Sequence, residues 1–218
     1  MLDGKCRTVN WCSVVFSLSR FVPGFRSSFF SATRPKLTLQ PPDHFVVIEP
    51  DSELRSILGT EIEKATGARV AGIGFHECSE EVLVGAVPVV MYSQADRARA
   101  TLPVGVDFVA LHSQSVPASM QGEKSPGSEA LIGIVSRWPE FLRRARTILI
   151  AAGLHADALS VRDARAPGWH KGLRSTAFVI TDSQMAGQIP EGCAVRVVPL
   201  ISKASIAELQ EYVGLFFK

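Results

Sequence analysis

The feature that most constrains the fold is a strand joined directly to a helix in residues 130–154, ALIGIVSRWPEFLRRARTILIAAGL. The short apolar run at residues 131–135 is typical of a buried strand. Pro139 then begins a helix, at the position where its missing N–H costs least, and Gly153 ends it. The apolar positions on one face of this helix are Phe141, Leu142, Ala145, Ile148, Leu149 and Ala152. A buried strand followed by an amphipathic helix predicts an α/β fold with a parallel sheet.

The same alternation of strands and helices continues along most of the chain. We expect strands at residues 45–48, 69–75, 86–92, 106–111, 131–135, 160–162, 176–181 and 194–200. Helices are expected at residues 51–67, 79–84, 95–101 and 139–152, and from Ser205 onward, where Ser205 and Glu208 form a capping box. Alternation of this kind indicates a mostly parallel sheet.

The two halves of the chain have a similar order of elements. This similarity predicts two α/β lobes that resemble a periplasmic-binding-type sensor domain, or one doubly wound sheet if the lobes merge. We expect the first lobe at residues 44–112 and a crossover loop at residues 113–129, where Pro, Gly and Ser interrupt the pattern. The second lobe is expected at residues 130–218, including the C-terminal helix.

Residues 1–43 differ in composition from the rest of the chain. The first 40 residues contain six Lys or Arg residues against a single acid, Asp3, and they are rich in Ser and Phe. The three interpretations are a secretory signal peptide, an organellar transit segment, and a poorly ordered leader or start site that does not belong to the folded domain. We favour the leader, because the apolar stretch is short and no clear cleavage site follows it.

The remaining composition excludes several classes of protein. The chain carries a net charge of +2, so the residues after the basic leader are slightly acidic, unlike a nucleic-acid-binding surface. No run of about 18 apolar residues predicts a membrane-spanning helix. Cys6, Cys12, Cys78 and Cys193 form neither a metal-binding pattern nor a disulfide framework. We therefore expect a cytoplasmic protein that does not interact with membranes.

Common catalytic and cofactor motifs are absent. The sequence has no G-x-S-x-G elbow, no phosphate-binding loop and no H-E-x-x-H helix. Gly72 and Gly74 supply only part of a dinucleotide fingerprint, and they fall inside an expected strand. We therefore expect no metal, no cofactor and no catalysis.

Polar side chains follow three expected strands of the second lobe. Because the carboxyl ends of parallel neighbouring strands share one edge of a sheet, these side chains are expected to meet there. The candidate ligand-binding residues are Ser136, Arg137, Trp138, Arg162, Asp163, Trp169 and Asp182. Arg binds carboxylate or phosphate through paired hydrogen bonds, and Trp stacks on flat groups. The alternative interpretation is a surface network of Arg162 and Asp163, with the two tryptophans anchoring loops to the core.

Several segments share their texture with one protein family. They are SVPASMQG (residues 115–122), SRWPEFLRRARTILIAAGL (residues 136–154), RDARAPGW with GLRS (residues 162–175), and VITDS (residues 179–183). In these segments the chain resembles the C-terminal effector or dimerisation region of bacterial GntR-family transcriptional regulators. In such regulators a winged helix-turn-helix precedes this region. Residues 1–43 carry no recognisable helix-turn-helix, so DNA binding is expected only through a domain not evident in this chain.

The resemblance implies a non-catalytic domain for ligand sensing or dimerisation in transcriptional control, and it is compatible with a homodimer. The expected ligand is a small anion held between the lobes by Arg137 or Arg162, which shifts an equilibrium between open and closed forms. The alternative is a small α/β hydrolase or transferase that uses Ser136 or Asp182 and needs a base within hydrogen-bond reach.

Overall fold

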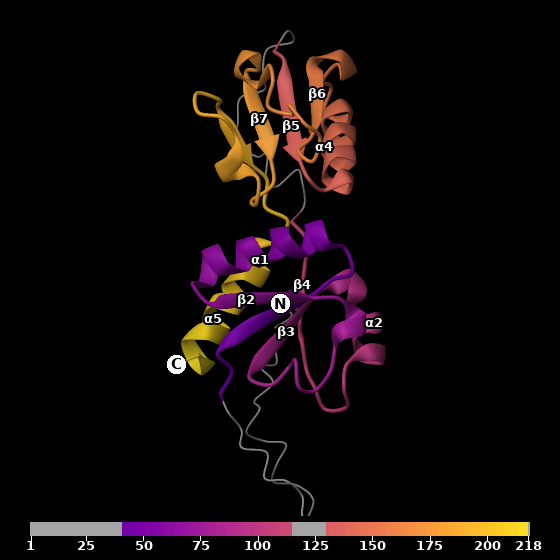
Figure 1. Ribbon diagram of the computed structural model, residues 1–218, viewed down its shortest axis with the longest axis vertical. Coiled ribbons are helices and arrows are strands. Elements are labelled where there is room, and N and C mark those ends of the chain that lie inside the picture. Colours follow the sequence, from indigo (N-terminus) through magenta and orange to yellow (C-terminus); the bar gives the residue numbers. More distant parts are fainter. Residues whose placement is uncertain (1–40, 115–129, 218) are drawn as a thin grey trace, which may run out of the picture. The chain divides into compact units, whose positions relative to one another are not determined.

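The computed structural model describes residues 41–114 and 130–217, and these form an α/β fold with two four-stranded parallel sheets (Figure 1). The first sheet has the strand order β2-β1-β3-β4. Its strands are β1 (His44–Ile48), β2 (Arg69–Ile73), β3 (Ala86–Met91) and β4 (Val109–Leu111). The second sheet repeats this order as β6-β5-β7-β8. Its strands are β5 (Ile132–Ser136), β6 (Leu159–Asp163), β7 (Phe178–Thr181) and β8 (Val195–Val197). The predicted two-lobed α/β fold is confirmed.

Four α-helices accompany the strands in the described part of the chain. They are α1 (Ser52–Thr66), α2 (Ala95–Thr101), α4 (Pro139–Ala151) and α5 (Lys203–Phe216). Asp51 caps α1 by accepting hydrogen bonds from the backbone N–H groups of Glu53 and Leu54, and Gly67 ends the helix in the left-handed conformation. Pro139 occupies the first turn of α4, as the sequence predicts. The helix expected at residues 79–84 is wrong, because this stretch forms turns.

Short 3-10 turns connect several of these elements. They are η2 (Phe75–Glu77), η3 (Tyr92–Gln94), η4 (Ala156–Ala158), η5 (Leu173–Ser175) and η6 (Ala186–Gln188). The turn η3 follows β3 without a break, so it lies at the carboxyl edge of the first sheet.

Helix α1 contributes to two hydrophobic clusters. Its buried Leu58 and Ile62 pack with Phe45 and Val47 of the first sheet. Its buried Ile57 packs instead with residues of the second lobe, including Ile134. One helix therefore buries apolar surface against both lobes, which stabilises their association in proportion to the area removed from water.

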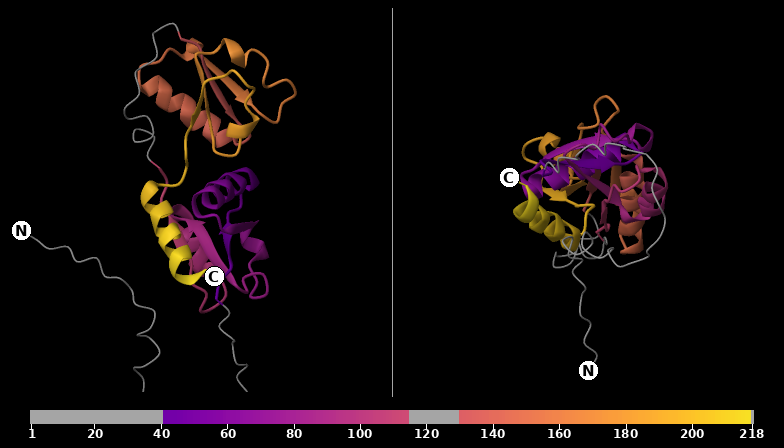
Figure 2. Two further views of the ribbon diagram at one scale, coloured as in Figure 1. Left: turned by 90° about the vertical axis from the view of Figure 1, so that its left-hand side faces the viewer. Right: turned by 90° about the horizontal axis from the view of Figure 1, so that it is seen from below.

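The C-terminal helix packs against the first sheet, although the sequence prediction grouped it with the second lobe. Leu209 of α5 and Ile201 before it are buried in the cluster that contains Phe45. Gln210 Nε2 donates a hydrogen bond to the backbone oxygen of Ala65 at 2.8 Å. Figures 1 and 2 show α5, in yellow, running beside the first sheet. The apolar pattern of an amphipathic helix suits either lobe. Here the helix packs against the first lobe because the chain returns to that lobe before the helix begins.

Two chain segments connect the lobes, and they lie side by side. Ser113 and Ile201 form an isolated antiparallel bridge. The N–H of Gln114 donates to the oxygen of Leu200 at 2.7 Å, and the N–H of Ser202 donates to the oxygen of His112 at 2.8 Å. The predicted crossover at residues 113–129 lies mostly outside the described residues, as does nearly all of the predicted leader at residues 1–43.

No helix in the described ranges combines the length and apolar character needed to cross a membrane.

Candidate functional site

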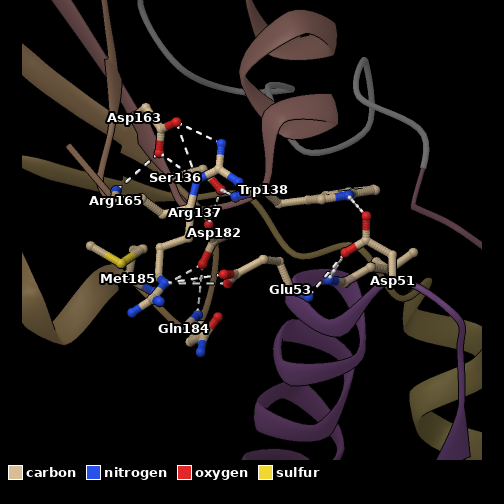
Figure 3. Close-up of polar contacts among 11 residues, drawn as sticks. Asp51, Glu53, Ser136, Arg137, Trp138, Asp163, Arg165, Asp182, Gln184 and Met185 are labelled. Carbon is tan, nitrogen blue, oxygen red and sulfur yellow. Dashed lines mark hydrogen bonds and ion pairs between the residues drawn. The ribbon is translucent and has the colours of Figure 1, made fainter. Parts of the chain in front are cut away.

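The carboxyl ends of β5, β6 and β7 bring three of the predicted site residues to one edge of the second sheet (Figure 3). Ser136 is in register with Asp163, and Asp182 follows β7 directly. The hydroxyl of Ser136 donates to Oδ2 of Asp182 at 2.5 Å. The other carboxylate oxygen of Asp182 accepts the backbone N–H groups of Gln184 and Met185, each at 2.9 Å.

Ser136 and Asp182 organise the turns around them. Both are fully buried. Oγ of Ser136 also accepts the backbone N–H of Trp138 at 3.0 Å, so the serine itself binds a free N–H group at the start of α4. A carboxylate therefore lies within reach of Ser136, as the hydrolase alternative requires, but neither side chain is accessible to a substrate in this conformation.

Arg137 and Trp138 point toward the first lobe (Figure 3). The indole N–H of Trp138 donates to Oδ2 of Asp51 at 3.2 Å, and the side chain of Arg137 forms an ion pair with Glu53 at 3.3 Å. Asp51 thus caps α1 with one oxygen and holds the second lobe with the other. These two predicted site residues form contacts between the lobes.

Asp163 lies at the edge with Ser136 and Asp182 but pairs with a different residue, and Arg162 and Trp169 have other surroundings. Asp163 pairs with Arg165 at 2.6 Å, and the hydrogen bonds from that guanidinium lower the pKa of the Asp163 carboxyl. Arg162 is exposed on the edge strand β6. Trp169 packs with a hydrophobic cluster built around Met185 and stacks edge-on against His170. The seven predicted residues therefore do not line one pocket.

A cavity of about 400 Å³ lies between the lobes, and Trp138 is the predicted site residue that lines it. The first lobe contributes the carboxyl edge of its sheet: Glu49 after β1, Met91 at the end of β3, and Ser93 and Gln94 of η3. The second lobe contributes one face of α4, namely Phe141, Arg144, Ala145, Ile148 and Leu149. The two connecting segments complete the wall with Ser113, Gln114 and residues 198–200. A volume of this size suits a small organic ligand.

The first-lobe wall of the cavity lies where the strand order reverses. Strand β1 continues to β2 on one side and borders β3 on the other. In open parallel sheets, ligands bind at the carboxyl ends of the two strands that flank this reversal. Glu49 and Met91 occupy those two ends. Sequence reasoning missed them because it searched the second lobe. The signal that could have found them is their position at the ends of two expected strands, residues 45–48 and 86–92, because ligands bind beyond the carboxyl ends of parallel strands.

Glu49 is the buried charged group of the cavity wall. Its side chain and backbone together are 3% exposed. One carboxylate oxygen accepts the backbone N–H of Asp51 at 3.2 Å. Burial raises the pKa of the Glu49 carboxyl above its ordinary value, and the Asp51 N–H opposes that rise. No ion pair to Glu49 within 4.0 Å is found in the described residues.

A second buried carboxylate, Glu61 of α1, joins both lobes to the connecting segment. It accepts the hydroxyl of Ser183 at 2.8 Å and the backbone N–H groups of Leu200 and Ile201 at 2.8 and 2.9 Å. Lys64, one turn further along α1, donates to the backbone oxygen of Ser183 at 3.1 Å. Burial raises the pKa of the Glu61 carboxyl, and its N–H partners oppose the rise. Glu61 therefore fixes the point where the chain returns to the first lobe.

Residues 41–114 and 130–217 contain no group of three or more His, Cys, Asp or Glu side chains placed to hold a metal ion. The fold and cavity define a class: a two-lobed parallel α/β protein with a ligand-sized cavity between its lobes. The chain matches no protein-family model, and comparisons with curated proteins and with solved structures gave no match.

Proposed function

We propose that this chain is a non-catalytic ligand-sensing domain, in which a small molecule binds between the lobes and shifts an equilibrium between open and closed forms. The observation that carries the proposal is the cavity of about 400 Å³, whose wall includes both lobes and both connecting segments. A ligand at such a place contacts groups that move relative to one another when the lobes rotate. It therefore has different affinities for the two forms, which is the requirement for shifting the equilibrium.

The contacts between the lobes support a reversible motion. One is the partly exposed ion pair of Arg137 with Glu53. Another is a single hydrogen bond from the indole of the buried Trp138 to the exposed Asp51. An exposed ion pair contributes only about 0–1 kcal/mol, and a hydrogen bond to a charged group about 1.5–3 kcal/mol, so both contacts can break and reform. Glu61, by contrast, is buried at the connecting segment and is suited to act as the fixed point of a hinge.

The proposed role in transcription rests on the resemblance to the effector region of GntR-family regulators, which is carried by residues 115–122, 136–154, 162–169, 172–175 and 179–183. Its test is the reading frame upstream of Met1. An in-frame winged helix-turn-helix supports a regulator of this kind. A frame that encodes none, together with absence of the chain from any DNA-bound complex, contradicts it.

The ligand-sensing proposal is tested by thermal-shift screening of the full chain against a metabolite library. A ligand that binds only the folded state raises the melting temperature according to its concentration over Kd. Ala145→Trp fills the cavity from α4 and should abolish the shift. Ala151→Trp, on an exposed position of the same helix, should preserve it. Small-angle scattering with the ligand should then report a smaller radius of gyration.

Two results would overturn this proposal. The first is a library screen without any stabilising ligand. The second is a stabilising ligand whose effect survives Ala145→Trp unchanged. The hydrolase or transferase alternative needs an accessible nucleophile, and Ser136 is fully buried with its hydroxyl on Asp182.

A further inference from the structure

We infer that the cavity between the lobes binds an apolar molecule bearing one positively charged amine, with the amine on Glu49 and the apolar part against α4. This inference rests on the proposed ligand-sensing function and names the chemical class of the ligand. It differs from the anionic ligand expected from the sequence, because neither Arg137 nor Arg162 lines the cavity.

The carboxylate of Glu49 has unfilled hydrogen-bonding capacity. An ionised carboxylate has about four acceptor positions. In the described part of the chain, the Glu49 carboxylate accepts one backbone N–H, at the long distance of 3.2 Å. The guanidinium of Arg55 donates a hydrogen bond to the backbone oxygen of Glu49 and not to its carboxylate. The Glu49 residue is 3% exposed, and its carboxylate borders the cavity with acceptor positions to spare.

The burial of Glu49 has an energetic cost. A charge held away from water is unfavourable unless a partner compensates it. The raised pKa of Glu49 reports this cost, since burial is its largest cause. The charges of Arg55 and Arg97 oppose part of the rise, but neither forms an ion pair with the carboxylate within 4.0 Å in the described residues. A cationic group entering the cavity supplies a partner in direct contact, whereas an anionic group adds a second negative charge in the same space.

Arg144 is a cation on the cavity wall. Arg144 is 63% exposed in its side chain and donates to Glu140 at 2.6 Å. Glu140 is shared with Arg143, and its pKa is lowered by hydrogen bonds from Arg143 and Arg144. Arg144 is therefore already paired at the solvent-facing side, where it also lies 5.9 Å above the ring of Trp138. Arg144 therefore adds little to the binding of an anion in the cavity.

Much of the remaining cavity wall is apolar. Phe141, Ile148 and Leu149 of α4, with Met91 of β3, present apolar surface to the cavity. Such a wall favours a hydrocarbon or aromatic body. Four neutral polar side chains also line the cavity: Ser93 and Gln94 of the first lobe, and Ser113 and Gln114 of the connecting segment. They can form hydrogen bonds with further polar atoms of the ligand without adding charge.

The test uses three probes with one apolar body and different head groups: phenylbutylamine, phenylbutyrate and phenylbutanol. Binding to the full chain is measured by saturation-transfer NMR and by Trp fluorescence. We expect the amine to bind more tightly than the alcohol and the acid. Glu49→Gln should weaken amine binding about thirtyfold, the loss typical of breaking a buried charge pair, and should leave the alcohol unchanged. Glu63→Gln, an exposed acid on α1, is the matched control and should leave all three unchanged.

The outcomes separate this inference from the function on which it rests. Preference for the amine that is lost in Glu49→Gln supports it. Equal or tighter binding of the acid or alcohol, or amine binding unaffected by Glu49→Gln, overturns the charge assignment but leaves a ligand-binding cavity. No binding of the amine at about 10 mM, while other library ligands stabilise the chain through Ala145, also overturns it. Failure of every ligand in the library contradicts the sensor proposal itself.

Discussion

The two sheets have the same strand order, but their carboxyl edges differ in how their polar groups are satisfied. At the edge of the second sheet, the Asp182 carboxylate accepts three hydrogen bonds from Ser136, Gln184 and Met185. At the equivalent edge of the first sheet, the Glu49 carboxylate accepts one from the described residues and faces a cavity. The same topology therefore gives a closed structural edge in one lobe and an edge with free binding capacity in the other. Topology identifies where a ligand can bind, and the satisfaction of hydrogen bonds decides which of two equivalent edges is available.

The comparison assigns the largest structural effect to Glu61, which joins the two lobes. Glu61→Ala leaves the buried N–H groups of Leu200 and Ile201 and the hydroxyl of Ser183 without their acceptor. We expect a loss of about 3 kcal/mol in the free energy of unfolding, measured by urea denaturation. Glu63→Ala, on the exposed side of the same helix, should change it by less than about 0.5 kcal/mol. A loss below about 1 kcal/mol for Glu61→Ala contradicts its role as the fixed point.

The closed edge of the second sheet should respond as a structural element. Asp182→Ala removes the acceptor for the Ser136 hydroxyl and for two backbone N–H groups. We expect a loss of about 2 kcal/mol in the free energy of unfolding. Affinity for a ligand of the cavity should stay unchanged in the folded fraction. A ligand affinity that falls with Asp182→Ala, at unchanged stability, would place the site at this edge and break the comparison.

The open edge of the first sheet predicts a pH dependence with a definite sign. The pKa of Glu49 is raised in the folded state, because burial and the charge of Asp51 outweigh the Asp51 N–H and the charges of Arg55 and Arg97. The folded state therefore holds the proton more tightly than the unfolded state. The contribution of Glu49 to the free energy of unfolding is therefore largest below its unfolded pKa and falls as the pH rises through its folded pKa. Glu49→Gln lacks this loss. The variant should gain stability relative to the natural protein as the pH rises from about 4 to 7.

Thermal unfolding of both proteins across that pH range measures the difference, and Glu61, which also has a raised pKa, is common to both. A difference that stays constant, or that falls as the pH rises, contradicts the assignment of Glu49 as a buried carboxylate without an ion pair in the described residues.

The smallest expected effect is at Arg137, which the sequence had favoured as a ligand-binding residue. Its ion pair with Glu53 is partly exposed. Arg137→Ala should therefore cost less than about 1 kcal/mol, and a double-mutant cycle with Glu53→Ala should give a coupling of about 0.5 kcal/mol or less. A coupling several times larger would show that this contact holds the lobes together.

Much of the fold could be predicted from the sequence because the signals are local. The strand and helix around Pro139 follow from apolar spacing, a proline and a stop at Gly153, and the structure confirms them. The position of α5 could not be predicted, because Leu209 and its neighbours form an apolar face that suits either sheet. That choice depends on the return of the chain past Ser113, which is a contact between residues far apart in sequence.

The candidate site shows the same division. The sequence correctly indicated that polar residues gather at strand ends, as Ser136, Asp163 and Asp182 do. It could not indicate that Ser136 and Asp182 satisfy each other, nor that Glu49 is left with spare acceptor positions, because both depend on distances in the folded chain. A single Glu after a strand reads as an ordinary exposed residue until its burial is known.

The central claim is that a ligand binds at the carboxyl edge of the first sheet. The most direct measurement is amide hydrogen exchange of the full chain with and without a stabilising ligand from the library. The account predicts slower exchange in residues 91–94 and 144–149, which line the cavity, and no change in residues 162–169. Protection confined to residues 162–169 and 182–185, at the edge of the second sheet, would contradict it.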